Sequence, residues 1–229
     1  MGIRWLERPY EYVQNDVQRY LHRYLRTEVS EVRRICIVGA HLGYEVMPIL
    51  RQFPCAEIRL FEASQRYVAK LKSKFASERR VHIYECAASD SDGFMTFYET
   101  NLTGSGSLLR VGVLARKSYG MEQAESFQVA ATRLDTHAHE NGYDQETIDC
   151  LWIDVQGAEM AVLRGAAEIL NRTRSIFIEV SIFMPLYEGG SVFFELERYL
   201  FDYGFRVVSL GTDAVNGTGN AFLIRIIES

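Results

Sequence analysis

Two carboxylates, Asp154 and Glu159, stand on either side of a glycine turn and are the first candidates for chemistry in this chain. Residues 151–153 before them are all apolar, as in a strand that is buried on both faces. Gly157 lets the chain turn tightly, so that Glu159 falls in the first turn of a helix. Carboxylates in this position can accept a proton from a reacting hydroxyl group. They can equally cap the helix and stabilise its first turn, and the spacing alone leaves both roles open.

A glycine loop follows the apolar strand predicted at 33–38. Gly39 and Gly43 frame this loop, and a helix is expected after it. A strand, a glycine loop and a helix place backbone N–H groups at a ligand. The dinucleotide-binding pattern needs glycine where this chain has His41 and Tyr44, which disfavours NAD and FAD.

Three further strand ends carry candidate residues. Glu62 ends the strand 57–62, about 20 residues after the glycine loop, where nucleotide-binding α/β folds hold ribose hydroxyls. The alternative for Glu62 is an ordinary strand-end acid. The strand 81–86 leads into Ala87 and Ala88, which are small enough to let a flat ring approach the backbone. Glu179 lies near the end of another buried strand.

The elements that must position these residues alternate between strands and helices. This order predicts an α/β fold with a mostly parallel sheet and helices on both faces. The last two strands, at 205–210 and 221–227, have no crossover helix between them and must be antiparallel. A helix at 10–25 has a face rich in tyrosine and aliphatic residues, including Tyr20 and Tyr24. That face is expected to pack on the core, with a substrate mouth or a homodimer contact as the alternatives.

Several local features receive their own predictions. Residues 99–126 show no regular pattern and are expected to cover the substrate, with Arg110, Arg116 and Lys117 as contacts; a merely mobile loop is the alternative. Ser64 and Asp135 are expected to cap the helices that follow them. His137 and His139 are two residues apart, do not share a helix face, and are interpreted as surface residues rather than metal ligands.

Composition excludes several classes of protein. The chain has 229 residues, 48% of them hydrophobic, and a net charge of −5, which argues against a general nucleic-acid-binding surface. Its four cysteines form no CxxC pair, and three lie in or beside apolar runs, as in buried thiols of a reducing compartment. We expect no metal site, no secretory signal, no membrane span of the ~20 apolar residues required, and a cytoplasmic location.

One stretch resembles a known signature. Residues 153–159 read Ile-Asp-Val-Gln-Gly-Ala-Glu and residues 162–166 read Val-Leu-Arg-Gly-Ala. This is similar to the FkbM family of methyltransferases, which usually reads Ile/Val-Asp-Val-Glu-Gly-Ala-Glu followed by Leu-basic-Gly-Ala. Residues 37–44 align with that family's first motif, Asp-Val-Gly-Ala-Asn-x-Gly-Tyr, and Leu134-Asp135 matches its Leu-Asp. The resemblance extends over roughly 33–210.

The resemblance implies a Rossmann-like class I methyltransferase fold, with 1–30 as a helical extension packed on a methyltransferase domain at 31–229. It implies S-adenosylmethionine as the cofactor, with the glycine loop around its methionine part, Glu62 on the ribose and residues 86–88 beside the adenine. Asp154 would lie beside the sulfonium and the incoming substrate. The full set of implied cofactor residues is Gly39, Ala40, His41, Gly43, Glu62, Ala63, Cys86, Ala87, Ala88, Asp154 and Val155.

The implied activity is O-methyl transfer to a hydroxyl of a sugar or a secondary metabolite. Such a transfer needs a general base within hydrogen-bonding reach of the hydroxyl. The candidates are Asp154, Glu159 and Glu179, with His41 as a fourth.

Three residues depart from the family pattern: Ile37 replaces an acid, His41 replaces Asn, and Gln156 replaces Glu. Ile37 and Gln156 support the alternative of a methyltransferase-like fold that binds the cofactor or a partner with little or no catalysis. An RNA methyltransferase is a third hypothesis, which the acidic balance disfavours. Acceptor choice is expected to rest on 99–126, 182–190 and the N-terminal helix.

Overall fold

A computed structural model describes residues 9–213 and 217–226, with side chains from Val17 onward. Outside it lie 1–8, for which the sequence predicts no secretory signal, 214–216, and 227–229, which include the last residue of the final predicted strand. Among the described helices, none combines the length and the apolar character that crossing a bilayer requires.

The helices are α1 (Pro9–Thr27), α2 (Val46–Gln52), α3 (Gln65–Lys74), α4 (Val113–Tyr119), α5 (Leu134–Glu140), α6 (Glu159–Arg164), α7 (Ala167–Leu170) and α8 (Phe193–Asp202). The strands are β1 (Arg34–Val38), β2 (Glu57–Glu62), β3 (Val81–Glu85), β4 (Ala87–Ala88), β5 (Gly93–Thr100), β6 (Gln123–Thr132), β7 (Cys150–Ile153), β8 (Ser175–Ser181), β9 (Phe205–Thr212) and β10 (Thr218–Arg225).

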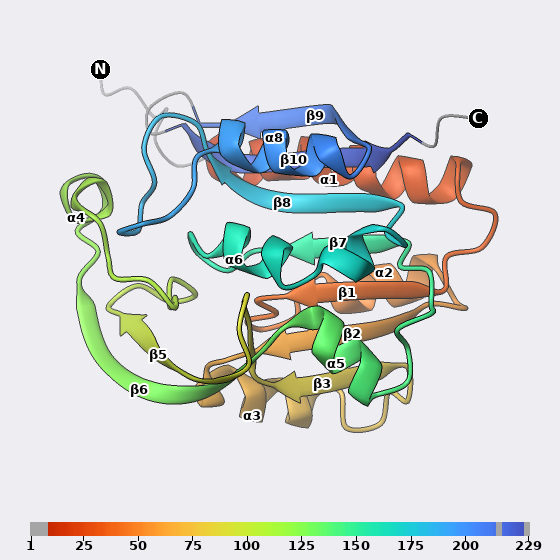
Figure 1. Ribbon diagram of the computed structural model, residues 1–229, viewed down its shortest axis with the longest axis horizontal. Coiled ribbons are helices and arrows are strands. Elements are labelled where there is room, and N and C mark those ends of the chain that lie inside the picture. Colours follow the sequence, from red (N-terminus) through yellow and green to blue (C-terminus); the bar gives the residue numbers. More distant parts are fainter. Residues whose placement is uncertain (1–8, 214–216, 227–229) are drawn as a thin grey trace, which may run out of the picture.

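The main sheet has the strand order β3-β2-β1-β7-β8-β10-β9. In this sheet, β3, β2, β1, β7 and β8 pair in parallel, and β10 runs antiparallel to both β8 and β9. Helices cover both faces, with α5 to α8 on the near face of Figure 1 and α1 to α3 on the far face. The mostly parallel sheet and the terminal antiparallel hairpin predicted from the sequence are therefore confirmed.

Each central strand contributes to two cores because its side chains alternate between the faces of the sheet. Along β1, Ile35 and Ile37 are buried against the layer of α1, α2 and α3, whereas Cys36 and Val38 are buried against the layer of α5 to α8. Full burial of one such apolar side chain contributes about 1.5–3 kcal/mol. The unbroken apolar runs in the sequence therefore reflect a sheet that is covered on both sides.

Helix α1 lies along β9 and β10 on the far face of the sheet (Figure 1). Val17, Leu21 and Leu25 are buried at helical spacing, as predicted. The ring of Tyr24 meets the ring of Phe222 edge-on, with 5.6 Å between the ring centroids. The prediction of core packing was wrong for Tyr20, which is 51% exposed.

The segment 99–126 is more regular than predicted. It contains α4 and the first four residues of β6, which pairs with β5 along its length and with β4 at its far end. The irregularity prediction was wrong because residues 123–126 lack the apolar alternation of a buried strand: they are exposed and still complete the ladder. Figure 1 shows β5 and β6 curving past the carboxyl ends of β1, β2 and β3.

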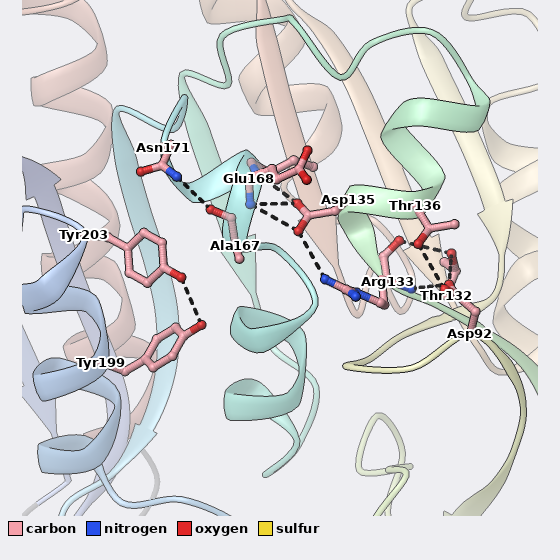
Figure 2. Close-up of polar contacts among 11 residues, drawn as sticks. Asp92, Thr132, Arg133, Asp135, Thr136, Ala167, Glu168, Asn171, Tyr199 and Tyr203 are labelled. Atoms are coloured by element: carbon pink, nitrogen blue, oxygen red, sulfur yellow. Dashed lines mark hydrogen bonds and ion pairs between the residues drawn. The ribbon is translucent and has the colours of Figure 1, made fainter.

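Asp135 joins two helices, as Figure 2 shows. The sequence predicts that it caps its own helix α5, but its carboxylate accepts the backbone N–H groups of Glu168 and Ile169, at 3.0–3.1 Å, where α7 begins. His137 was predicted at the surface, yet it is buried and its Nδ1 lies 2.7 Å from the hydroxyl of Tyr143. The partners of Asp135 are more than 30 residues away in the sequence, and the partner of His137 follows the end of α5.

Candidate functional site

The site lies where the sheet reverses its strand order, between β1 and β7. Val38 and Ile153 are paired in register, so the loops that follow them leave the sheet side by side. A Cβ atom added to Gly39 would lie 1.8 Å from the backbone oxygen of Asp154, and Gly39 has a φ of +83°. Glycine is therefore required here by the close approach of the two loops. Ligands of open α/β sheets bind at such a switch point.

Glu62 holds the glycine loop in place. Its Oε2 accepts the N–H of His41 at 2.7 Å, and its Oε1 accepts the N–H of Ser64 at 2.8 Å. Burial raises the pKa of Glu62 to about 7, and these N–H groups oppose that rise. Each carboxylate oxygen has a further lone pair, which leaves capacity to accept hydroxyl hydrogens. The ribose role remains a prediction, and no pattern in the sequence indicates this link to the loop.

The helix cap predicted at Ser64 was wrong. The Ser64 hydroxyl donates to Oε1 of Glu99 at 2.5 Å and makes no capping bond to α3. Glu99 is buried, and it comes from β5. A partner 35 residues away thus outcompetes the local backbone N–H groups for this hydroxyl.

A cavity of about 60 Å³ opens beside Glu62. Every implied cofactor residue lines it except Ala40 and Gly43, and its other walls include Tyr67, Phe97, Gly104, Gly106 and Leu108. Three hydrogen bonds hold the segment 104–108 over this cavity. They run from the Gly104 N–H to the Tyr67 hydroxyl (3.2 Å), from the Tyr187 hydroxyl to the Ser105 oxygen (2.8 Å), and from the Ser107 hydroxyl to the Gln156 backbone oxygen (2.8 Å).

Part of the predicted cover therefore lies over the site. The basic residues proposed as contacts are engaged elsewhere in two cases: Arg116 donates to the oxygen of Val111, and Arg110 lies over the ring of Tyr98.

A larger cavity, of about 390 Å³, lies on the other side of the glycine loop. Ala40 and Gly43 line it, together with Glu45, Trp152 and, from α1, Gln18 and His22. Gly39, His41 and Asp154 line both cavities, so the two spaces meet at these residues. His41 has a φ of +48°, and its Nε2 is buried without a hydrogen-bond partner in the described chain. Burial lowers the pKa of His41 and favours the neutral imidazole.

Asp154 and Glu179 converge on one amide. Nε2 of Gln156 donates to Oδ1 of Asp154 at 2.6 Å and to Oε2 of Glu179 at 2.8 Å, and its Oε1 lies 3.0 Å from the Tyr187 hydroxyl. Glu179 is close enough to Asp154 to oppose part of the rise in its pKa. Burial raises the pKa of Asp154, which suits a carboxyl pair that shares a proton. The family residue at 156 is an acid, and the amide here supplies the donor that two neighbouring carboxylates need.

Glu159 serves the turn between β7 and α6. Its Oε1 accepts the N–H groups of Gly157 at 3.0 Å and Val155 at 3.3 Å. The side chain is buried, which raises its pKa to about 7. It lines neither of the two cavities that meet at Asp154, but a third one of about 10 Å³ that Glu179 also lines. Within the described residues, no group of three or more His, Cys, Asp or Glu side chains is arranged to hold a metal ion.

The chain matches the model of the Methyltransferase FkbM domain over residues 38–207. It is 31% identical over 159 residues to the 2-O-methyltransferase NoeI of Sinorhizobium fredii (strain NBRC 101917 / NGR234). That alignment covers 66% of this chain and 64% of NoeI, so the chain spans less than two thirds of the relative's length.

Two solved structures share the fold at low sequence identity. Magnesium protoporphyrin IX methyltransferase (ChlM) of Synechocystis PCC 6803 with bound SAH aligns with a TM-score of 0.51 at 9% identity, covering 99% of this chain and 90% of that one. An rRNA methylase of Streptococcus thermophilus aligns with a TM-score of 0.52 at 8% identity, covering 92% and 97%. These likenesses show a class I methyltransferase fold and nothing about the substrate.

Proposed function

The chain belongs to the FkbM family of methyltransferases, and from that premise we propose that it transfers a methyl group from S-adenosylmethionine to a hydroxyl oxygen of a sugar or a secondary metabolite. The family brings with it the cofactor predicted from the sequence. The hydroxyl acceptor is supported by the relative NoeI, which is named as a 2-O-methyltransferase.

The observation that carries the proposal is the position of Asp154. It lines both cavities where they meet, and it shares Gln156 with Glu179. A cofactor that reaches from one cavity into the other passes this carboxylate. Glu62 and Asp154 also suit a cofactor with a positively charged sulfur, because both have raised pKa values and their charged forms gain from a nearby cation.

Different residues of the site bind different parts of the cofactor. The small side chains of Ala87 and Ala88 leave a flat wall for the adenine, and Glu62 can accept the ribose hydroxyls. Gly39 has no side chain, so the glycine loop can lie close to the backbone of Asp154 after β7. When bound, S-adenosylmethionine supplies a methyl group that its positive sulfur activates for displacement.

The protein then has two tasks, to align the acceptor oxygen and to remove its proton. We assign the removal of this proton to Asp154, whose raised pKa makes it a stronger base than an ordinary aspartate. Glu179 and the amide of Gln156 hold the Asp154 carboxylate and stabilise its charged form before reaction. Glu159 fixes the turn that presents this group.

One observation supports a second candidate function. Gln156 stands where the family usually has an acid, and an amide cannot accept a proton at neutral pH. If that acid is the base in the family, this chain binds the cofactor or a partner with little or no catalysis.

The test combines cofactor titration with turnover. We expect S-adenosylmethionine to bind by calorimetry and S-adenosylhomocysteine to form with a panel of sugars and hydroxylated metabolites. Asp154→Asn should lower kcat by about 10²–10⁴-fold. Asp202→Asn is the matched control, because Asp202 is exposed at the end of α8. Absence of cofactor binding would reject both functions, and binding without turnover on any acceptor would favour the second.

A further inference from the structure

Tyr187 is a buried tyrosine whose hydroxyl joins separate segments of the site. It comes from the connection between β8 and α8, and it is only 2% exposed. Its hydroxyl lies 2.8 Å from the backbone oxygen of Ser105, in the segment 104–108 that covers the cavity beside Glu62. The same hydroxyl lies 3.0 Å from Oε1 of Gln156. One phenol group therefore meets both the cover and the amide beside Asp154.

The ring of Tyr187 is held in place from two sides. A Cβ atom added to Gly157 would lie 2.9 Å from atoms of the Tyr187 side chain, so the ring packs directly on the turn after β7. Val111 and Tyr187 face each other in a short antiparallel bridge, and the Gly112 N–H donates to the Leu186 oxygen at 2.7 Å. These contacts determine where the hydroxyl points.

The amide of Gln156 needs a donor for its oxygen. Its Nε2 donates to Asp154 at 2.6 Å and to Glu179 at 2.8 Å, which uses both amide hydrogens. Its Oε1 accepts the hydrogen bond from the Tyr187 hydroxyl. Hydrogen bonds linked in this way polarise one another, so a donor at the oxygen strengthens the two bonds that the nitrogen gives. The hydroxyl and the two carboxylates together fix the orientation of the amide.

Tyr187 remains a neutral donor near neutral pH. Burial raises the pKa of its hydroxyl above the ordinary value, and the carboxylates of Glu179, Asp154 and Glu159 add to the rise. The hydroxyl therefore brings no charge of its own to the site. The hydrogen bond from Gln156 opposes the rise in the pKa of Asp154. Any effect of the hydroxyl on Asp154 is thus expected to pass through the amide.

We propose that Tyr187 is a positioning residue of the methyl transfer: its hydroxyl orients the Gln156 amide, which in turn holds the Asp154 carboxylate that accepts the proton of the acceptor. The inference rests on the proposed function, since it takes Asp154 as the base. Tyr187 lines neither of the two cavities that meet at Asp154, so it acts through Gln156 and not on the cofactor.

Other titratable groups also act on Asp154, and removal of the Tyr187 hydroxyl leaves all of them in the chain. They are His41 from the glycine loop, Glu45 before α2, Glu159 from α6 and Glu179 from β8. A change in the titration of Asp154 in Tyr187→Phe therefore reports on the amide.

The test is a titration of the free protein by nuclear magnetic resonance, with ¹³C in the side-chain carboxyl of aspartate. The Asp154 resonance is identified by its absence in Asp154→Asn. We expect Tyr187→Phe to move the midpoint of this resonance to higher pH by about 0.5–1, because the charged carboxylate loses support from the amide. Tyr67→Phe is the matched control: the Tyr67 hydroxyl accepts the N–H of Gly104 in the same cover, and its loss should move the midpoint by less than about 0.2.

A second variant tests whether the effect passes through the amide. Gln156→Met removes the amide and keeps a side chain of similar length. In that background, Tyr187→Phe should cause no further change in the Asp154 midpoint, because two residues that act along one path are not additive. With any acceptor that turns over, the acidic limb of kcat should move to higher pH in Tyr187→Phe, with an unchanged KM for S-adenosylmethionine.

The outcomes separate the two proposals. An unchanged or lower midpoint in Tyr187→Phe, an equal shift in Tyr67→Phe, or a further shift in the Gln156→Met background would overturn the role of Tyr187 and leave the methyltransferase proposal standing. Failure of the wild-type protein to bind S-adenosylmethionine would reject the transfer itself, whatever the titrations show. If Tyr187→Phe does not fold, Gln156→Met decides alone, because an unchanged midpoint there would show that the amide does not control Asp154.

Discussion

Replacing Gln156 with glutamate is expected to destabilise this protein, most strongly at alkaline pH. The change is isosteric and exchanges one NH₂ group for an oxygen. Gln156 has a φ of +56°, but the backbone cost is the same for both residues and cancels. What changes is the centre of the site, where the amide now donates to Asp154 at 2.6 Å and Glu179 at 2.8 Å. A third carboxylate would face the other two with no donor between them.

The magnitude follows from the two bonds that are lost. A hydrogen bond to a charged group contributes about 1.5–3 kcal/mol. All three side chains are only half-buried, so the lower value applies to each bond, which gives a loss of about 3 kcal/mol. For a chain of this size, 1 kcal/mol shifts the melting temperature by about 2–4 °C, so the expected fall is about 6–12 °C.

The pH dependence distinguishes this mechanism from a general packing defect. Neighbouring carboxylates raise the pKa of the new glutamate in the folded protein above its unfolded value. The variant is therefore least destabilised below the unfolded pKa, where the protonated carboxyl still donates one hydrogen bond. The deficit should grow as pH rises through the folded pKa. Thermal melts of both proteins from pH 5 to pH 8 give this difference directly.

Gln145→Glu is a matched control for the substitution. Nε2 of Gln145 also donates to a carboxylate, Oδ2 of Asp144, at 2.7 Å, but this pair is exposed on a loop. Exposed pairs contribute little, so the control should change the free energy of unfolding by less than about 1 kcal/mol. A Gln156→Glu variant that melts with the control at pH 8, or that loses as much at pH 5, would refute the reasoning.

Two further predictions concern the same edge of the sheet. Glu62 and Glu159 are buried and Glu45 is half-buried, and burial raises the pKa of each to about 7. The unfolded chain therefore releases these protons first, and the free energy of unfolding should fall as pH rises from about 4.5 to 7; a flat profile in urea titrations, or one that rises, would contradict these pKa values. Gly39→Ala would place a Cβ atom 1.8 Å from the backbone oxygen of Asp154, so cofactor binding should be lost in calorimetry, whereas Gly142→Ala, with nothing within 4 Å of its added Cβ, should bind normally.

The sequence by itself determined the order and type of most elements. The apolar runs at 35–38, 151–153 and 176–178 are strands because a sheet that is covered on both faces has no polar side, and the intervening helices favour parallel pairing. The same logic placed the glycine loop, Glu62 and Asp154 at one edge, since the carboxyl ends of parallel strands meet there. Which of these residues touch the cofactor remains a prediction.

The tertiary structure decided which partners each acid meets. The sequence around Glu159 does not distinguish a catalytic base from a residue that stabilises the turn. Only the structure shows that one of its oxygens accepts two N–H groups of this turn. In the sequence, Gln156 is only a departure from a motif. In the structure, its amide also donates to Glu179, which is 23 residues away. These outcomes depend on partners that are distant along the chain, and local spacing carries no information about such partners.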